Sequence, residues 1–201
     1  MRGQTGLFLI IFLILVLAAT GLVVILNYNG IIKAEKAVGE AKAQIAAVCQ
    51  RRLDLIPNLV EIVKGYAQHE KDTLIAITKA RSSAKEILDE VSGKKSLNKE
   101  DITALTTSQS ELSHTLKSIF ALAENYPDLK ASSNFLALQD QLEGSENRVA
   151  VARIRYNHEV RIYNSKIATF PGVILAPMFG FEPKDSFEAK EEAQEAVKIK
   201  F

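Results

Sequence analysis

The sequence has no tryptophan, a single cysteine and only five prolines among its 201 residues. Because Cys49 stands alone, an intrachain disulfide is excluded and the redox compartment is not indicated. An excess of one charge is also missing. The chain has 25 basic and 24 acidic residues, and setting Arg2 aside leaves 24 of each in residues 27–201. A neutral region has no broad field that would concentrate nucleic acid, so no nucleic-acid partner is expected.

The motifs of common enzyme classes are absent as well. The chain has no Gly-x-Ser-x-Gly elbow, no phosphate-binding glycine loop and no Gly-x-Gly-x-x-Gly. A di-iron bundle needs two Glu-x-x-His motifs, and the sequence has one, from Glu111 to His114. Cys49 shares a predicted helix face with apolar residues, which favours a small core residue over a nucleophile. We therefore expect no enzymatic activity, no metal site and no cofactor.

One long hydrophobic run dominates the start of the chain. After a short tail (residues 1–6), residues 7–26 read LFLIIFLILVLAATGLVVIL without a charge. At about 1.5 Å per residue this run spans roughly 30 Å, the thickness of a bilayer's hydrocarbon core. A cleaved signal peptide has a shorter run that ends in small residues, whereas here apolar residues 22–26 follow them. We predict a retained transmembrane helix, with the side of the membrane left open.

Residues 27–170 show apolar residues at alternating steps of three and four, which is typical of packed helices. Strand-like alternation is absent. Breakers separate the segments: Gly93, a cap at Asn98 with Asp101, Pro127 and Pro171. The predicted fold class is all-α, an N-terminal transmembrane helix followed by an antiparallel four-helix bundle with long helices. The residues at this spacing form a predicted buried seam on each helix. The seam of the third helix is Ile102, Leu105, Gln109, Leu112, Leu116, Ile119, Ala123 and Tyr126. The seam of the fourth helix is Phe135, Leu138, Leu142, Ser145, Val149, Ala152, Tyr156, Val160, Tyr163 and Ile167.

Pro57 decides where the first helix of the bundle ends. An unbroken helix over residues 28–91 would be about 96 Å long and would outrun its partners. Proline suits the first turn of a helix, and Asp54 stands just upstream as a cap. We therefore predict a tight reversal near Asp54–Pro57.

The residues after the predicted bundle fall into two segments. Residues 171–184 begin PGVILAPMFGF, which is apolar but too short to span a bilayer. Two alternatives stay open: this segment lies in the membrane interface, or it folds back over the end of the bundle. The candidate interface residues are Val173, Ile174, Leu175, Phe179 and Phe181. Residues 185–201 are predicted to form a charged tail helix.

Several stretches together resemble the bacterial LemA family. They are RRLDLIPNLV at residues 51–60 with VKGYA at 63–67 and His69-Glu70, YPDLKA at 126–131, Glu146-Asn147-Arg148 through Tyr156-Asn157, Tyr163-Asn164, Phe170-Pro171, and Phe179-Gly180-Phe181 with Phe187. The resemblance covers about residues 27–189. It implies a membrane-anchored helical bundle without established enzymatic activity. The family includes a magnetosome protein implicated in shaping membranes.

Two polar groups are candidate partner or structural sites. The first comprises Arg51, Arg52, Asp54, Pro57 and Asn58. Its arginines either bind phosphate or an acidic partner, or tie the predicted reversal together through helix-end carbonyls. The second comprises Tyr66, His69 and Glu70, which interrupt an apolar stripe. A buried polar network that sets helix register is expected there, with a ligand or ion site as the alternative.

These observations favour a non-enzymatic scaffold in the bacterial inner membrane. Its expected partners are membrane lipid, through the anchor, and proteins or further copies of itself. Two alternatives remain: a membrane-remodelling protein that inserts residues 171–181, and a sensor that binds a ligand or ion inside the bundle.

Overall fold

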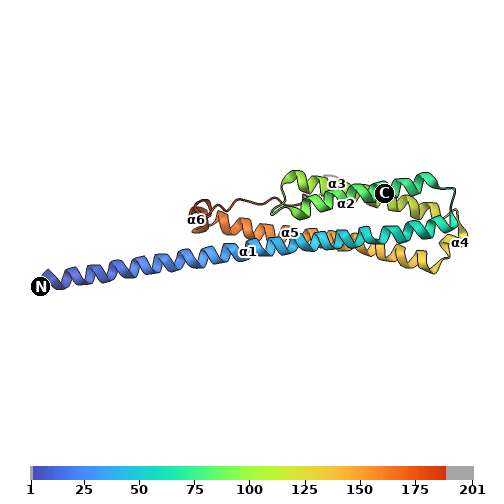
Figure 1. Ribbon diagram of the computed structural model, residues 1–201. Helices are drawn as coiled ribbons and strands as arrows, with labels where there is room; N and C mark the ends of the chain where they lie inside the picture. The colour runs from blue at the N-terminus through green and yellow to red at the C-terminus, as the bar shows by residue number, and fades with distance from the viewer. Residues whose placement is uncertain (1, 189–201) are drawn as a thin grey trace, which may run out of the picture. The chain divides into compact units, whose positions relative to one another are not determined.

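The computed structural model describes the backbone of residues 2–188 and the side chains of residues 9–188. These residues form helices and connecting loops without a strand, so the all-α prediction is confirmed (Figure 1). The helices are α1 (Arg2–Tyr66), α2 (Lys71–Gly93), α3 (Lys99–Ala123), α4 (Pro127–Lys130), α5 (Ser133–Ala168) and α6 (Gly172–Met178). The predicted tail helix is wrong for residues 185–188, which are not helical, and its remainder lies outside the described residues.

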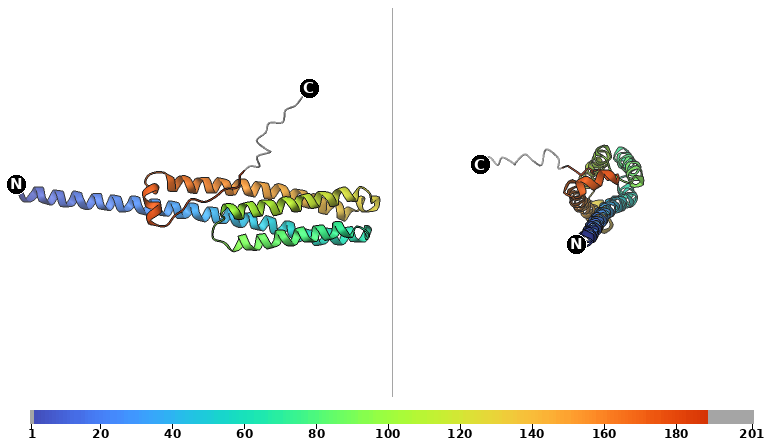
Figure 2. Two further views of the ribbon diagram at one scale, coloured as in Figure 1. Left: turned by 90° about the horizontal axis from the view of Figure 1, so that it is seen from above. Right: turned by 90° about the vertical axis from the view of Figure 1, so that its left-hand side faces the viewer.

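Contacts group the chain into two compact units. Of the described residues, the first unit comprises 2–38 and 159–184, and the second comprises 39–158 and 185–188. Within the second unit α1 and α2 pair in antiparallel order, since Lys42 bonds the Ser92 carbonyl at 3.2 Å and the Arg81 side chain bonds the Leu53 carbonyl at 3.0 Å. In the same unit α2 and α3 lie side by side with parts of α1 and α5 (Figure 2).

The predicted seams of α3 and α5 form buried faces. Every seam residue is buried except Tyr126, which is half-buried. The helix start at Asn98 is also confirmed, because its side chain accepts a hydrogen bond from the Asp101 backbone N–H at 2.8 Å. In return, the Asp101 carboxylate accepts a hydrogen bond from the Asn98 backbone N–H. The three-four spacing therefore identified the apolar core of both helices correctly.

The predicted reversal at Asp54–Pro57 is wrong. Helix α1 continues through Pro57 to Tyr66, and the chain turns at residues 67–70 instead. The buried stripe of α1 runs on unbroken as Leu53, Ile56, Leu59 and Val63, all fully buried. Pro57 lies on the exposed face of the helix. Burial of this stripe outweighs the cost of proline within the helix.

A side chain from α2 replaces the hydrogen bond that Pro57 cannot make. In a regular helix the N–H of residue 57 would donate to the carbonyl of Leu53, and proline has no N–H. Arg81 Nε donates to that carbonyl at 3.0 Å. The carbonyl is thus satisfied by a cationic donor, which makes a stronger hydrogen bond than a neutral one.

Replacement of Arg81 by methionine should therefore destabilise the protein. The variant keeps an apolar stem but leaves the Leu53 carbonyl without its donor, so we expect a loss of about 1–3 kcal/mol in the free energy of unfolding. Chemical denaturation of the full-length protein in detergent measures it. Lys79→Met, an exposed change on the same helix, is the control. Equal stability of the two variants would rule out this role for Arg81.

Candidate functional site

One helix among the described residues, the part of α1 that begins at Leu9, is long and apolar enough to cross a membrane. Its side chains between Leu9 and Leu26 are exposed, apart from the half-exposed Val24. A contiguous apolar surface of this size is unfavourable in water and favourable in lipid. The exposure is therefore what a membrane-spanning segment requires.

An aromatic cluster forms in the first unit just after this apolar run. The ring of Tyr28 lies edge-on to Phe179, with 5.0 Å between ring centroids, and 5.8 Å from Phe181. Contacts of this geometry stabilise aromatic pairs beyond their burial. The cluster holds the end of α6 against α1 two residues after the run ends at Leu26. Figure 2 shows the α6 ribbon beside that of α1.

Helix α6 is apolar on both of its faces. Gly172, Leu175 and Ala176 are buried. Among the candidate interface residues, Leu175 thus packs inside and Phe181 is half-buried. The remaining three, Val173, Ile174 and Phe179, are exposed, and so are Phe170 and Met178. The segment therefore covers protein with one face and presents apolar side chains to its surroundings with the other.

The chain after α6 is fastened to α5 by a tyrosine and an asparagine of the first unit. Tyr163 OH donates to the Glu182 carbonyl at 3.0 Å. The Asn164 amide donates to the Lys184 carbonyl at 2.9 Å and accepts from the Lys184 N–H at 3.0 Å. One side chain thus satisfies both backbone groups of a residue outside regular structure.

The second unit contains the same arrangement one heptad earlier in α5. Tyr156 OH donates to the Asp185 carbonyl at 3.2 Å. The Asn157 amide donates to the Phe187 carbonyl at 2.7 Å and accepts from its N–H at 2.8 Å. In the sequence, the Tyr-Asn pairs stand out only as part of the family resemblance. The two pairs are seven residues apart, and each has a polar group next to the apolar seam of the helix. This repeat is the sequence signal that could have predicted their hydrogen bonds to the chain after α6.

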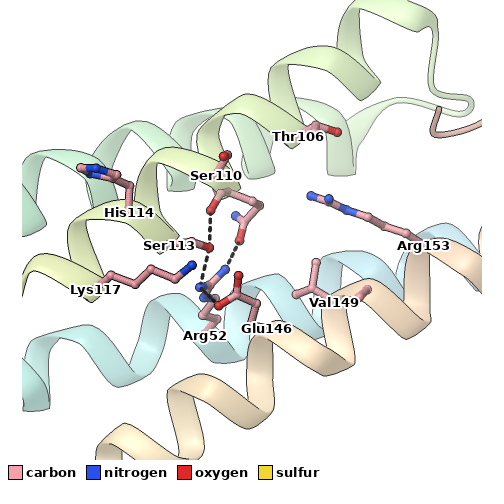
Figure 3. Close-up of a pocket in the computed structure, with 11 residues that line it drawn as sticks. Arg52, Thr106, Ser110, Ser113, His114, Lys117, Glu146, Val149 and Arg153 are labelled. Atoms are coloured by element: carbon pink, nitrogen blue, oxygen red, sulfur yellow. Dashed lines mark hydrogen bonds and ion pairs between the residues drawn. The ribbon is translucent and has the colours of Figure 1, made fainter. Parts of the chain in front are cut away.

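Arg52 is the one residue of the first predicted polar group that turns inward. Its side chain is only 2% exposed. It donates to Ser113 Oγ at 2.9 Å and to Gln109 Oε1 at 3.5 Å, and lies 3.6 Å from the Glu146 carboxylate (Figure 3). Burial lowers the pKa of Arg52, while Glu146 opposes the shift. Arg52 therefore joins α1, α3 and α5 within the second unit.

A cavity of about 390 Å³ opens beside Arg52. The charged residues that line it are Arg52, Lys117, Arg153 and Glu146, and His114 lies at its edge (Figure 3). Burial lowers the pKa of Arg153 as well. The cavity is therefore a polar site with more basic than acidic side chains.

The other predicted polar residues do not join this site. Arg51, Asp54, Pro57 and Asn58 are exposed along α1, so the two arginines do not act as a pair and no helix end lies near them. A hydrogen bond of 2.7 Å joins the Gln50 amide to Asp54.

The second predicted polar group lies at the turn between α1 and α2. Tyr66 and His69 are exposed there. Glu70 accepts a hydrogen bond of 2.8 Å from the Tyr126 hydroxyl, which links the turn to the end of α3. The expected buried network does not form at Tyr66 and His69, and Arg148 and Arg155 of α5 are exposed as well, with Arg148 bonding the Gln141 carbonyl. The interruption of the apolar stripe thus marks a helix reversal.

Cys49 is fully buried, in agreement with its prediction as a core residue. Burial raises the pKa of its thiol from 9.0 to about 11, with Arg153 and Arg52 opposing the shift. Two pKa units correspond to an about hundredfold smaller thiolate fraction at neutral pH, and the thiolate is the nucleophile.

We expect maleimide to label Cys49 only when the protein unfolds. Asn58→Cys in a Cys49→Ala background should label at once, and equally fast labelling of native Cys49 would contradict its burial.

Comparisons with known proteins agree with these features. The model of the LemA family matches residues 41–201. A protein named LemA from Metamycoplasma hominis is 26% identical over 168 residues, which cover 84% of this chain and 72% of the relative. The magnetosome protein MamQ from Magnetospirillum gryphiswaldense is 24% identical over 207 residues, which cover 94% of this chain and 74% of the relative. This chain is accordingly a membrane-associated member of the LemA family.

Proposed function

We propose that this protein is a non-enzymatic scaffold, anchored by a single pass of α1 in the bacterial inner membrane, that organises partner proteins or copies of itself there. The contact of Tyr28 with Phe179 and Phe181 carries the proposal. It fastens an apolar segment beside the point where the apolar run of α1 ends. Such a segment gives the protein a second lipid contact, in the membrane interface, in addition to the anchor.

The side chains of α6 support this assignment. Phe170 is 79% exposed and Met178 is 73% exposed, and Val173 and Ile174 lie between them in the sequence. Large exposed apolar residues that are close together in the chain are uncommon on proteins surrounded by water. In the membrane interface the same surface is favourable by about 25 cal/mol for each Å² removed from water.

The scaffold role can be tested by crosslinking in intact membranes. Photoreactive residues would replace Ile75 on α2 and Ile154 on α5, which are exposed apolar positions of the second unit. We expect adducts with specific proteins or with a second copy of the chain. A matched photoreactive residue at Leu53, which is fully buried, should give no adduct to another protein. Recovery of monomer alone from both exposed positions would count against a scaffold.

A second candidate function is membrane remodelling by insertion of residues 171–181. The exposed face of α6 is the observation that favours it. Because the chain has no tryptophan, Phe179→Trp in the full-length protein reports on this one site. Brominated lipids should quench its fluorescence in reconstituted vesicles if the segment lies in the interface.

Two further tryptophan variants frame this experiment. Leu17→Trp, in the apolar run of α1, should be quenched most strongly. Ile154→Trp, also exposed but on α5, should not be quenched. Absence of quenching at residue 179 would contradict both the second lipid contact and the remodelling function. Quenching without any change in vesicle shape would support the second lipid contact and contradict the remodelling function.

A further inference from the structure

The cavity beside Arg52 carries an excess of positive charge. Arg52, Lys117 and Arg153 contribute three positive charges, and Glu146 contributes the one negative charge among the lining residues, which leaves a net charge of +2. Figure 3 shows Lys117 and Arg153 reaching into the cavity from opposite sides. Cations that line one cavity repel one another, and an anion placed between them relieves this repulsion.

Three residues that line the cavity carry a buried donor without an acceptor. Arg52 Nε, Gln109 Nε2 and Arg153 Nε are all buried and have no hydrogen-bond partner among the described residues. Arg52 and Gln109 are also almost wholly buried as residues, at 2% and 3% exposure. An unsatisfied buried donor is costly, so three around one cavity call for an explanation. Their side chains all belong to the lining of the cavity, which is therefore rich in donors for an anion.

We propose that this cavity binds a phosphate group, either free or as part of a small phosphate monoester. A phosphate carries a charge of about −1.5 to −2 near neutral pH, which matches the net charge of the lining. The guanidinium group is suited to phosphate because its donors lie in a planar fork. The cavity of about 390 Å³ exceeds a bare phosphate ion, and Val149 and Ala150 supply a wall for the remainder of an ester.

Glu146 acts as an internal competitor for the ligand. Its carboxylate lies 3.6 Å from Arg52, while its side chain is half exposed. An ion pair with one exposed partner is weak and readily rearranged. Phosphate binding therefore moves Glu146 away from Arg52, and removal of its charge strengthens binding.

The test uses the full-length protein in detergent, titrated with sodium phosphate against sodium chloride at equal ionic strength. The midpoint of thermal unfolding and isothermal calorimetry report binding. The titration is made at about pH 8, where inorganic phosphate is mostly dianionic, as are phosphate monoesters, whose second pKa is about 6. We expect wild type to show a phosphate-specific rise in the melting midpoint. Lys117→Gln and Arg153→Gln should each weaken binding by about tenfold or more, because each removes a charge-assisted hydrogen bond.

Two further variants sharpen the result. Glu146→Gln should bind phosphate more tightly than wild type. Arg155→Gln removes an exposed arginine from the same helix, outside the cavity, and should bind as wild type does. Lys117 is exposed, so its variant remains informative even if Arg153→Gln, which also loses the 5.3 Å contact with the Phe187 ring, fails to fold. A response that is absent in wild type, or unchanged in Lys117→Gln, overturns the proposal.

The source of the phosphate is resolved by a second pair of probes. Glycerol 3-phosphate and a short-chain phosphatidic acid carry the same headgroup chemistry. Equal affinity for both supports a soluble ester as a sufficient ligand, whereas binding of the lipid alone supports a headgroup. If neither competes with inorganic phosphate, the ester form of the proposal is wrong.

Discussion

Replacement of Ile56 by alanine should destabilise the second unit by about 2–5 kcal/mol, the usual cost of truncating a fully buried isoleucine. Ile56 has no exposed surface, and it lies on the stripe that continues from Leu53 to Leu59. The lost side chain leaves a cavity lined by residues that cannot close it without moving whole helices. Denaturant unfolding followed by circular dichroism gives the change in the free energy of unfolding.

The control for Ile56→Ala is Asn58→Ala, only two residues along α1. Asn58 is exposed, so its replacement should change stability by less than about 0.5 kcal/mol. If α1 ended in a reversal at Pro57, residues 54–58 would lie in an exposed turn and both changes would be mild. Similar, small effects of the two substitutions would therefore contradict the continuous helix.

Replacement of Gly172 by alanine should detach α6 from the end of α5. A Cβ atom built on Gly172 would lie 1.9 Å from the backbone carbonyl oxygen of Lys166. A backbone atom cannot turn aside as a side chain can, so one of the two segments must move. Overpacking usually costs about 1–3 kcal/mol, and the upper end of that range is expected here. Hydrogen exchange of residues 172–181 in the full-length protein should accelerate by about tenfold to a hundredfold.

Loss of the aromatic cluster should accompany this movement. If α6 is displaced, Phe179 leaves Tyr28, and a tryptophan at position 179 should become more accessible to a soluble quencher. Gly39→Ala is the matched control, since no atom lies within 4 Å of the added Cβ. Because alanine is about 1 kcal/mol better than glycine inside a helix, this change should stabilise α1. Unchanged exchange in Gly172→Ala would show that the close approach is not required.

The helical seams could be predicted from the sequence because their cause is local. The spacing of Leu105, Leu112 and Leu116 places these side chains on one face wherever the helix packs, and all three are buried. The cap at Asn98 is local in the same sense, since its partner Asp101 is three residues away. Such features depend on a few consecutive residues and not on the tertiary arrangement.

The end of α1 could not be predicted because its cause is distant. Proline normally opens or ends a helix, and the sequence around Pro57 offers no sign that Arg81, 24 residues later, would satisfy the Leu53 carbonyl. The interruption at His69 and Glu70 is visible in the sequence, but the sequence alone favours a polar network inside a helix. An exposed turn explains it more simply.

The candidate site also combines features that local sequence predicts with features that depend on distant residues. The apolar character of residues 171–181 was evident, and the structure resolves its two faces into the buried Leu175 and the exposed Val173 and Ile174. The cavity could not be foreseen, because Arg52, Lys117 and Arg153 are far apart in the chain and meet only through packing of α1, α3 and α5. Lys117 and Arg153 alone read as ordinary helix-surface residues, and the sequence points to Arg52 only as a neighbour of Arg51 at a reversal that the structure does not have.

Extraction of native membranes with alkaline carbonate tests the central claim most directly, because this treatment releases proteins held at a surface and leaves those with a spanning helix. The full-length protein should stay in the membrane pellet. A variant with Leu13→Arg and Leu17→Arg, which places two charges within the apolar run, should be lost to the supernatant or fail to insert. Release of the unaltered protein by carbonate would contradict the account of α1 as a membrane anchor.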